Sequence, residues 1–313
     1  MENKLVSVVV PLYNSARFID KTLRAVFSSS YSHFEVILID DGSTDATRAV
    51  LEQKGWVNKV TYIYQENKGI SASRNIGIKA ANGKYISLLD HDDIPLPEKL
   101  SLLVDYLERH PEYKMVYTPV IVDNPNVEKK TLYPKNNNNW VLRYEGDLFD
   151  TLFHRNHIMP SSTLFDRQSM LDVGLFDETY QIVEDVEFML RYSMGYKIGY
   201  VEQPLTIYSW RHDNTSRRLS KIIPEFEMRL YKRYYGELKK RSVDADRIFK
   251  QAMGNSYRDK AKWETKDCNY GTAIDWYIKA IQLDPMRIKN YNRLIKVLIM
   301  LTMHKMNRFR PDY

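Results

Sequence analysis

The sequence lacks features on which several classes of protein depend. Its 313 residues include a single cysteine, Cys268, so no disulfide can form within the chain and a reducing compartment is expected. The apolar run in MENKLVSVVVPLYN stops at Pro11 and is too short for a signal sequence. No later stretch approaches the roughly 18 apolar residues of a membrane span. We therefore expect a cytoplasmic protein.

Glycine-rich phosphate cradles are also missing. There is neither a G-x-G-x-x-G dinucleotide fingerprint nor a G-x-x-x-x-G-K-[ST] P-loop. The acidic stretches DDGSTD and DHDD lack the glycine and glutamate of an EF-hand loop. A nucleotide bound by this chain would have to be held by carboxylates and a metal ion instead.

What remains is the composition of a soluble globular protein with a basic end. Hydrophobic residues make up 43% and charged residues 27%, enough for one large or two modest domains. The net charge is +6, and residues 286–311 contain no acid but seven basic residues: Arg287, Lys289, Arg293, Lys296, Lys305, Arg308 and Arg310. Such a tail suits an anionic membrane surface, nucleic acid or simple solubility.

Apolar strands alternate with helical patterns through the first hundred residues. Strands are predicted at 5–10, 34–40, 60–66 and 84–90, each followed by a helical or capped segment. Continuous apolar strands in this alternation predict an α/β fold, a Rossmann-like and mostly parallel sheet flanked by helices. Ligands of such sheets bind beyond the carboxyl ends of the strands.

The rest of the chain has a different character. Residues 123–157 are polar and aperiodic, which predicts a long surface loop that orders over a substrate. From about Ile222 the patterns are helical only, so we expect a catalytic domain at 1–216 and a helical region at 217–313. Residues 253–285 resemble one tetratricopeptide repeat. A helical hairpin and a binding array are the two interpretations left open.

The stretch LLDHDDIP places three aspartates, Asp90, Asp92 and Asp93, at the end of the fourth strand. Like charges this close repel one another, and a solvated acidic turn is the simplest interpretation. A second interpretation is chemical: Mg²⁺ or Mn²⁺ bound to a diphosphate needs only one or two protein carboxylates. Asp40 and Asp41 end a neighbouring strand and would reach the same crevice.

Four segments in order resemble the family 2 glycosyltransferases of bacterial surface-polysaccharide synthesis. They are VSVVVPLYN, EVILIDDGSTDAT, NKGISASRNIGIKAANGKYISLLDHDD and VGLFDETYQIVEDVEFMLR, spread over about residues 5–211. The resemblance implies the glycosyltransferase A fold, a nucleotide-sugar donor and inversion at the anomeric carbon. It favours a hexosyl- or N-acetylhexosaminyltransferase.

The resemblance also implies roles for residues on the donor side. Pro11 and Tyr13 shape the base pocket, Asp41 hydrogen-bonds the nucleobase and Arg74 lies near the phosphates or sugar. Asp92 lies near the ribose or sugar, Asp93 reaches the metal, and Asp90 supports it. Two alternatives stay open: Tyr13 as a core residue and Arg74 paired with Glu66.

Inverting transfer needs a general base for the acceptor hydroxyl. The resemblance assigns this role to Asp185 of the pair in QIVEDVEF, with Glu184 orienting it. The alternative is a charged helix start favoured by the helix dipole.

Three further expectations concern the edges of the site. Ser161 and Ser162 are expected to offer hydroxyls on the acceptor side. Arg211 and His212 resemble contacts of a loop that closes over the diphosphate, and His212 is the best histidine candidate for the metal.

The basic tail, 286–311, is expected either to bind anionic lipid as an amphipathic helix or to end the core.

The sequence therefore predicts a metal-dependent inverting glycosyltransferase. Its donor would be a nucleotide sugar, for which the resemblance favours a UDP-linked one, and its acceptor a hydroxyl of a glycan or lipid-linked saccharide. We expect Mn²⁺ or Mg²⁺ as cofactor, no nucleic-acid partner, and a location in the cytoplasm or on the inner face of the membrane. A sugar nucleotidyltransferase and a non-catalytic helical scaffold are the alternatives.

Overall fold

A computed structural model describes residues 4–126, 131–134, 144–211 and 219–308. The chain forms two compact units, one of residues 1–152 and 156–212, the other of residues 153–155 and 213–313. The boundary that the sequence predicts near residue 216 lies within 212–218, outside the described residues.

The first unit is built on a seven-stranded sheet in the order β10-β6-β9-β4-β1-β2-β3. The β4, β1, β2 and β3 strands are parallel neighbours, whereas β9 runs antiparallel to both β4 and β6. The predicted α/β fold with a mostly parallel sheet is therefore confirmed. The strands are β1 (Val6–Leu12), β2 (Phe34–Asp41), β3 (Thr61–Gln65), β4 (Tyr85–Leu88), β6 (Tyr113–Tyr117), β9 (Thr163–Asp166) and β10 (Lys197–Tyr200).

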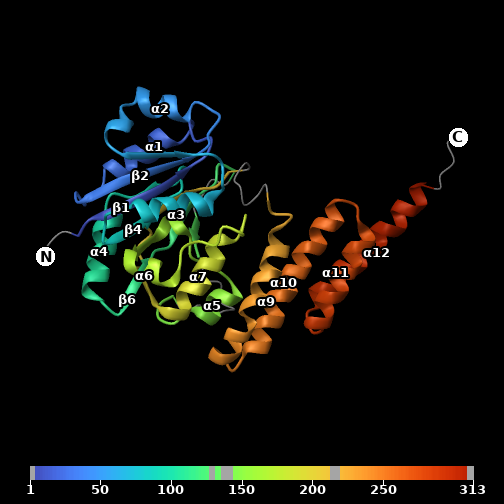
Figure 1. Cartoon of the computed structure of the whole chain (residues 1–313). Coiled ribbons are helices and arrows are strands. Elements are labelled where there is room, and N and C mark those ends of the chain that lie inside the picture. Colours follow the sequence, from blue (N-terminus) through green and yellow to red (C-terminus); the bar gives the residue numbers. More distant parts are fainter. Residues whose placement is uncertain (1–3, 127–130, 135–143, 212–218, 309–313) are drawn as a thin grey trace. The chain divides into compact units, whose positions relative to one another are not determined.

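Helices cover both faces of this sheet (Figure 1). One face packs against α1, α2 and α4 through a cluster that contains Val8, Leu23 and Leu103. The other face packs against α3, where Gly77 lies so close to Val9 that a side chain would collide with it. The helices are α1 (Ile19–Phe27), α2 (Thr47–Gln53), α3 (Ile70–Ala80), α4 (Lys99–Arg109), α6 (Arg167–Val173) and α7 (Glu184–Gly195), with short 3₁₀ turns η1 (Trp56–Asn58) and η2 (Pro160–Ser162).

A second, four-stranded sheet lies beside the segment that follows β4. Its order is β5-β11-β7-β8, formed by β5 (Ile94–Pro95), β11 (Thr206–Ser209), β7 (Val120–Asp123) and β8 (Thr131–Tyr133). The prediction of an unbroken loop over 123–157 is wrong in part, because β8 and α5 (Phe149–His154) fall inside it. Polar composition concealed these elements because both are short.

The second unit consists of helices in its described part. They are α9 (Ile223–Arg241), α10 (Ala245–Lys266), α11 (Tyr270–Leu283) and α12 (Ile288–Arg308). The tetratricopeptide-like residues form the α10–α11 hairpin, whose small residues Ala261 and Ala273 let aromatic Tyr277 and Val297 of α12 pack into one cluster. Among the described residues, no helix combines the length and the apolar character needed to cross a bilayer.

Candidate active site

The aspartates of LLDHDDIP form a tight turn between β4 and β5. The amide of Asp93 donates to the carbonyl of Asp90 (3.1 Å) and closes the turn. From outside, the Asp90 amide donates to Ser161 Oγ (3.0 Å), and the Ser209 amide donates to Asp93 Oδ1 (3.0 Å). Segments that lie far apart in the sequence therefore fix this turn, which sits at the carboxyl end of the parallel strands, where ligands of such sheets bind.

Basic residues compensate two of the three aspartates directly. Arg74 Nη2 lies 3.0 Å from Asp90 Oδ1, and Arg211 Nη1 lies 2.6 Å from Asp92 Oδ2. The Arg211 guanidinium also stacks over the ring of Phe18 at 3.9 Å. Arg211 therefore reaches the aspartate turn, and its predicted contact with a diphosphate stays a prediction. His212 lies outside the described residues.

Asp93 is the most deeply buried of the three and has an incomplete set of partners. Burial raises its pKa well above the usual range, and repulsion from Asp90 and Asp92 adds to this. Its Oδ2 has no hydrogen-bond partner among the described residues. A buried carboxylate oxygen without a partner is unfavourable unless a cation or a proton joins it.

These residues fit a divalent cation that takes most of its ligands from a diphosphate and water. In the described part of the chain, no three His, Cys, Asp or Glu side chains are grouped as a closed metal site. Mg²⁺ bound to substrate phosphates needs only one or two carboxylates, and Asp93 Oδ2 can supply one.

Arg74 links the aspartate turn to the Glu184–Asp185 pair. The side chain is 2% exposed, and its Nη1 donates to Glu184 Oε1 (2.8 Å) while Nη2 holds Asp90. The alternative partner Glu66 is wrong, because Arg74 pairs with Asp90 and Glu184. Its predicted place near the donor's phosphates or sugar stays a prediction. Its planar fork, which can bind two carboxylates at once, joins groups that lie on either side of it.

Glu184 is buried and Asp185 is half-buried at the start of α7. Burial raises the pKa of Glu184 to about 7, with repulsion from Asp185 adding to the shift and Arg74 opposing it. Burial also raises the pKa of Asp185, and Arg74 again opposes the shift. A carboxylate with a raised pKa beside a cation is suited to accept a proton near neutral pH.

The backbone that presents this pair is strained. Val183, which directly precedes it, has φ 59° and ψ 21°, a left-handed conformation that is rare for a β-branched residue. Asn75 holds the preceding segment, donating from Nδ2 to the Phe176 carbonyl (2.9 Å) and accepting from the Phe176 amide (2.8 Å). Sequence reasoning missed Asn75, although its place beside Arg74 in SASRN was a signal.

The predicted donor residues lie around the ends of β1 and β2. Pro11 is buried within β1, and Tyr13 follows that strand with 43% of its surface exposed, so Tyr13 is not a core residue. Asp41 is buried, and its carboxylate accepts from Gln65 Nε2 (2.6 Å) and from the amides of Lys68 (2.8 Å) and Gly69 (2.9 Å). Asp41 thus anchors the loop before α3, whatever it contributes to a nucleobase.

The two serines expected on the acceptor side are turned inward. Both are about 1% exposed. Ser161 Oγ accepts from the Asp90 amide, and Ser162 Oγ donates to the Met159 carbonyl (2.8 Å). The structure thus gives both hydroxyls partners inside the protein, and Ser161 braces the aspartate turn.

Comparison with known proteins agrees with this geometry. The family model described as Glycosyl transferase family 2 matches residues 7–174, more than half of the chain. An uncharacterized glycosyltransferase of Rickettsia bellii is 28% identical over 212 residues, 67% of this chain and 29% of that protein. Another, from Rickettsia prowazekii, is 28% identical over 193 residues, 60% of this chain and 58% of its own. The chain thus spans less than two thirds of the length of these two curated relatives.

Solved structures share the fold. S. aureus TarS 1–349 in complex with UDP-GlcNAc superposes with a TM-score of 0.62 at 18% identity, covering 91% of this chain and 82% of that one. The mannosyltransferase PcManGT of Pyrobaculum calidifontis, in complex with GDP-Man and Mn²⁺, gives 0.55 at 15% identity, covering 97% and 88%. The family match, which covers more than half of the chain, shows that the chain belongs to glycosyl transferase family 2.

Proposed function

We propose that this glycosyltransferase is metal-dependent and inverting, and that it moves a sugar from a UDP-linked donor to a hydroxyl of a glycan or lipid-linked saccharide in surface-polysaccharide synthesis. The observation that carries the proposal is that Arg74 connects two acidic clusters, the aspartate turn and the Glu184–Asp185 pair. In that turn, Asp93 keeps one carboxylate oxygen without a hydrogen-bond partner among the described residues. One group can hold a metal–diphosphate while the other accepts a proton.

In the proposed reaction, Asp185 takes the proton of the acceptor hydroxyl as its oxygen attacks the anomeric carbon and the bond to the nucleotide diphosphate breaks. Glu184, paired with Arg74, holds the orientation of its neighbour. Asp93 would hold the cation, and a bound cation stabilises the negative charge that grows on the departing diphosphate. Arg211, already paired with Asp92, is placed to contact that diphosphate.

The donor is the part of the proposal that binding can test directly. S. aureus TarS has been solved with UDP and with UDP-GlcNAc, and PcManGT with GDP-Man and Mn²⁺, so both nucleotides are candidates. We expect calorimetric titration with Mn²⁺ present to show tight binding of UDP, weaker binding of GDP and TDP, and loss of binding in EDTA.

Asp93→Asn tests the metal carboxylate in the same titration. Because an amide lacks the charge of a carboxylate, we expect UDP affinity in Mn²⁺ to fall by at least about tenfold. The matched control is Asp172→Asn, an exposed aspartate on α6, for which affinity should stay unchanged. UDP binding that survives EDTA, or that Asp93→Asn leaves intact, would contradict the metal role.

The last helix supports a membrane partner. On α12, Ile288, Ile295, Ile299 and Met303 are each more than half exposed and lie along one face. Val297, on another face, is buried in the core of the helical unit. The helix therefore packs by one face and leaves a second apolar face exposed in the described part of the chain.

Charge supports an anionic membrane surface as the occupant of the exposed α12 face. The basic side chains Lys289, Arg293 and Lys296 follow one another at helical spacing beside the apolar stripe, and 286–311 contains no acid. We therefore propose that the enzyme works at the inner face of a membrane, next to a lipid-linked acceptor.

A double variant, Ile295→Ser with Ile299→Ser, tests this placement. Because each isoleucine buried in the interface contributes about 1.5–3 kcal/mol, we expect its binding to vesicles rich in phosphatidylglycerol to weaken at least tenfold. The matched control, Ile278→Ser on α11, removes an equally apolar exposed side chain and should leave binding unchanged. If the wild-type protein does not sediment with these vesicles, the α12 face does not bind anionic lipid. If the double variant loses self-association, the face contacts a second copy of the chain and not lipid.

A further inference from the structure

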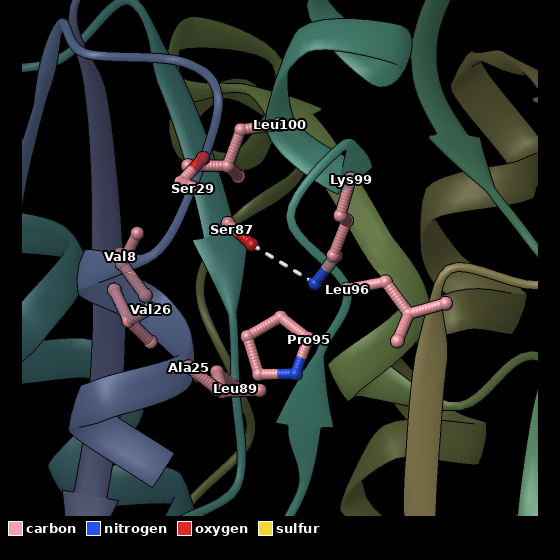
Figure 2. Close-up of a pocket in the computed structure, with 10 residues that line it drawn as sticks. All are labelled: Val8, Ala25, Val26, Ser29, Ser87, Leu89, Pro95, Leu96, Lys99 and Leu100. Carbon is pink, nitrogen blue, oxygen red and sulfur yellow. Dashed lines mark hydrogen bonds between the residues drawn. The ribbon is translucent and has the colours of Figure 1, made fainter.

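Lys99, the first residue of α4, is a buried cation that the proposed reaction does not use. Its side chain is 1% exposed and enters a small pocket between α1, β1, β4 and α4 (Figure 2). The walls of that pocket are mostly apolar, as Val8, Val26 and Leu100 illustrate. A lysine ammonium is rarely placed in such surroundings, because leaving water disfavours its charge.

The environment of Lys99 confirms that this placement is costly. Burial lowers its pKa to about 7, and only the attraction of Asp93 opposes the shift. The negative charge of Asp93 in the aspartate turn therefore favours the charged form of Lys99. A cost of this kind persists where the charged group serves a function that an apolar residue cannot.

Lys99 is connected to the aspartate turn by hydrogen bonds through one residue, Ser161. Its Nζ donates to the Ser161 carbonyl (2.7 Å) and to Ser87 Oγ (3.2 Å), the second bond being the dashed line in Figure 2. The hydroxyl of Ser161 in turn accepts from the Asp90 amide, and it also favours the charged form of Asp93. Ser161 is thus held by Lys99 on one side and holds the turn on the other.

We propose that Lys99 is a positioning residue for the metal–diphosphate site: it fixes Ser161 against β4, and Ser161 sets the position of Asp90 and Asp93. The inference rests on the proposed metal-dependent reaction. Groups one shell away from a metal ligand commonly change metal affinity 10- to 100-fold when they are removed.

Lys99→Met separates this role from a purely structural one. Methionine fills a similar volume without charge, and the Ser161 carbonyl keeps a donor because Thr206 Oγ1 also donates to it (3.0 Å). Removing a desolvated cation from an apolar pocket should leave the melting temperature equal or higher. A structural ammonium would give the opposite result, a lower melting temperature.

The decisive measurement is calorimetric titration of Mn²⁺ into full-length protein saturated with UDP, paired with thermal melting. We expect Lys99→Met to bind Mn²⁺ about tenfold more weakly with an unchanged or raised melting temperature. Lys99→Gln, which keeps a donor for Ser161, should lie within about threefold of wild type. The matched control is Lys260→Met, another largely buried lysine, which pairs with Glu225 and Glu264 on helices of the second unit. It should lose thermal stability without a change in Mn²⁺ affinity.

Two results would overturn the inference in distinguishable ways. If wild type binds Mn²⁺ with UDP and Lys99→Met binds it equally well, Lys99 does not position the site, while the proposed function stands. If wild type itself binds no Mn²⁺ in the presence of UDP, the proposed metal dependence fails and the role of Lys99 fails with it.

Discussion

Replacing Asp185 with asparagine is expected to lower kcat by about 10²- to 10⁴-fold while Mn²⁺–UDP affinity stays within about threefold. The base acts on the acceptor proton mainly in the transition state, so its removal affects turnover and leaves donor binding almost untouched. Asparagine has the same size as aspartate and can keep the hydrogen bond from the Val186 amide to the side-chain oxygen (2.8 Å). The loss should therefore report proton acceptance and not a collapse of the helix start.

The pH dependence of kcat/KM tests the role of Asp185 independently. Burial raises the pKa of Asp185 above its ordinary value, so the active, deprotonated form disappears as the pH falls. Wild-type kcat/KM should decline on the acid side at a higher pH than a free aspartate would dictate, and Asp185→Asn should remove its share of that decline. Burial raises the pKa of Glu184 to about 7, so Glu184 also contributes to the acid limb.

The control for this experiment is Asp172→Asn, which removes an exposed carboxylate on α6 and should change kcat by less than twofold. Steady-state measurement of sugar transfer gives kcat, and calorimetric titration of UDP in Mn²⁺ on the same preparations gives the nucleotide affinity. If Asp185→Asn weakens nucleotide binding as much as it lowers kcat, Asp185 belongs to the donor site and another group accepts the proton.

The sequence predicts the sheet and the position of the aspartate turn because both follow from local patterns. Apolar strands covered on both faces imply parallel neighbours, and parallel neighbours bring Asp41 and Asp90 to one edge. No tertiary information is needed for that step. It needs only the strand periodicity and the place where each strand stops.

The partners of the site could not be read in the same way. Arg74 and Glu184 are separated by 110 residues, and nothing in SASRN or QIVEDVEF shows that their side chains meet. Helical spacing says which residues share a face, but not which other element that face meets. Ser161 illustrates the same limit: its hydroxyl was expected to face an acceptor, while packing of η2 against the turn directs it to the Asp90 amide.

Neither strand periodicity nor helical spacing could have identified Lys99 as a residue of the site. In PEKLSLLVDYLERH it has the pattern of a solvated residue in the first turn of a helix. Its burial depends on how α4 packs against β4 and on the position of η2, which are tertiary facts. A charged residue in an apolar pocket conflicts with local expectation, and such conflicts concentrate at functional sites.

Arg74→Met is expected to give the largest loss of stability of any single change at the site, about 3–5 kcal/mol at pH 8. The variant leaves Glu184 and Asp90 without the cation that each now contacts, at 2.8 and 3.0 Å. Methionine replaces much of the aliphatic bulk, so packing against the Phe176 ring is largely kept. Most of the loss should therefore come from uncompensated negative charge.

That origin predicts how the loss depends on pH. Arg74 lowers the pKa values of Glu184 and Asp185, so removing it raises both further above their values in the unfolded chain. A carboxyl whose pKa is raised by folding is destabilising above that pKa, and the penalty disappears as the pH falls through it and the folded state takes up a proton. The difference in unfolding free energy between wild type and Arg74→Met should therefore be smaller at pH 5 than at pH 8.

Urea unfolding at the two pH values measures this difference. Arg109→Met serves as the matched control, because Arg109 forms an exposed pair with Asp105 (2.9 Å) whose loss should cost no more than about 0.5 kcal/mol at either pH. An equal loss for Arg74→Met at pH 5 and pH 8 would mean that Arg74 acts by packing alone. A loss that shrinks at pH 5 would mean that the buried guanidinium compensates the negative charge of Glu184 and Asp185, as a general base at this position requires.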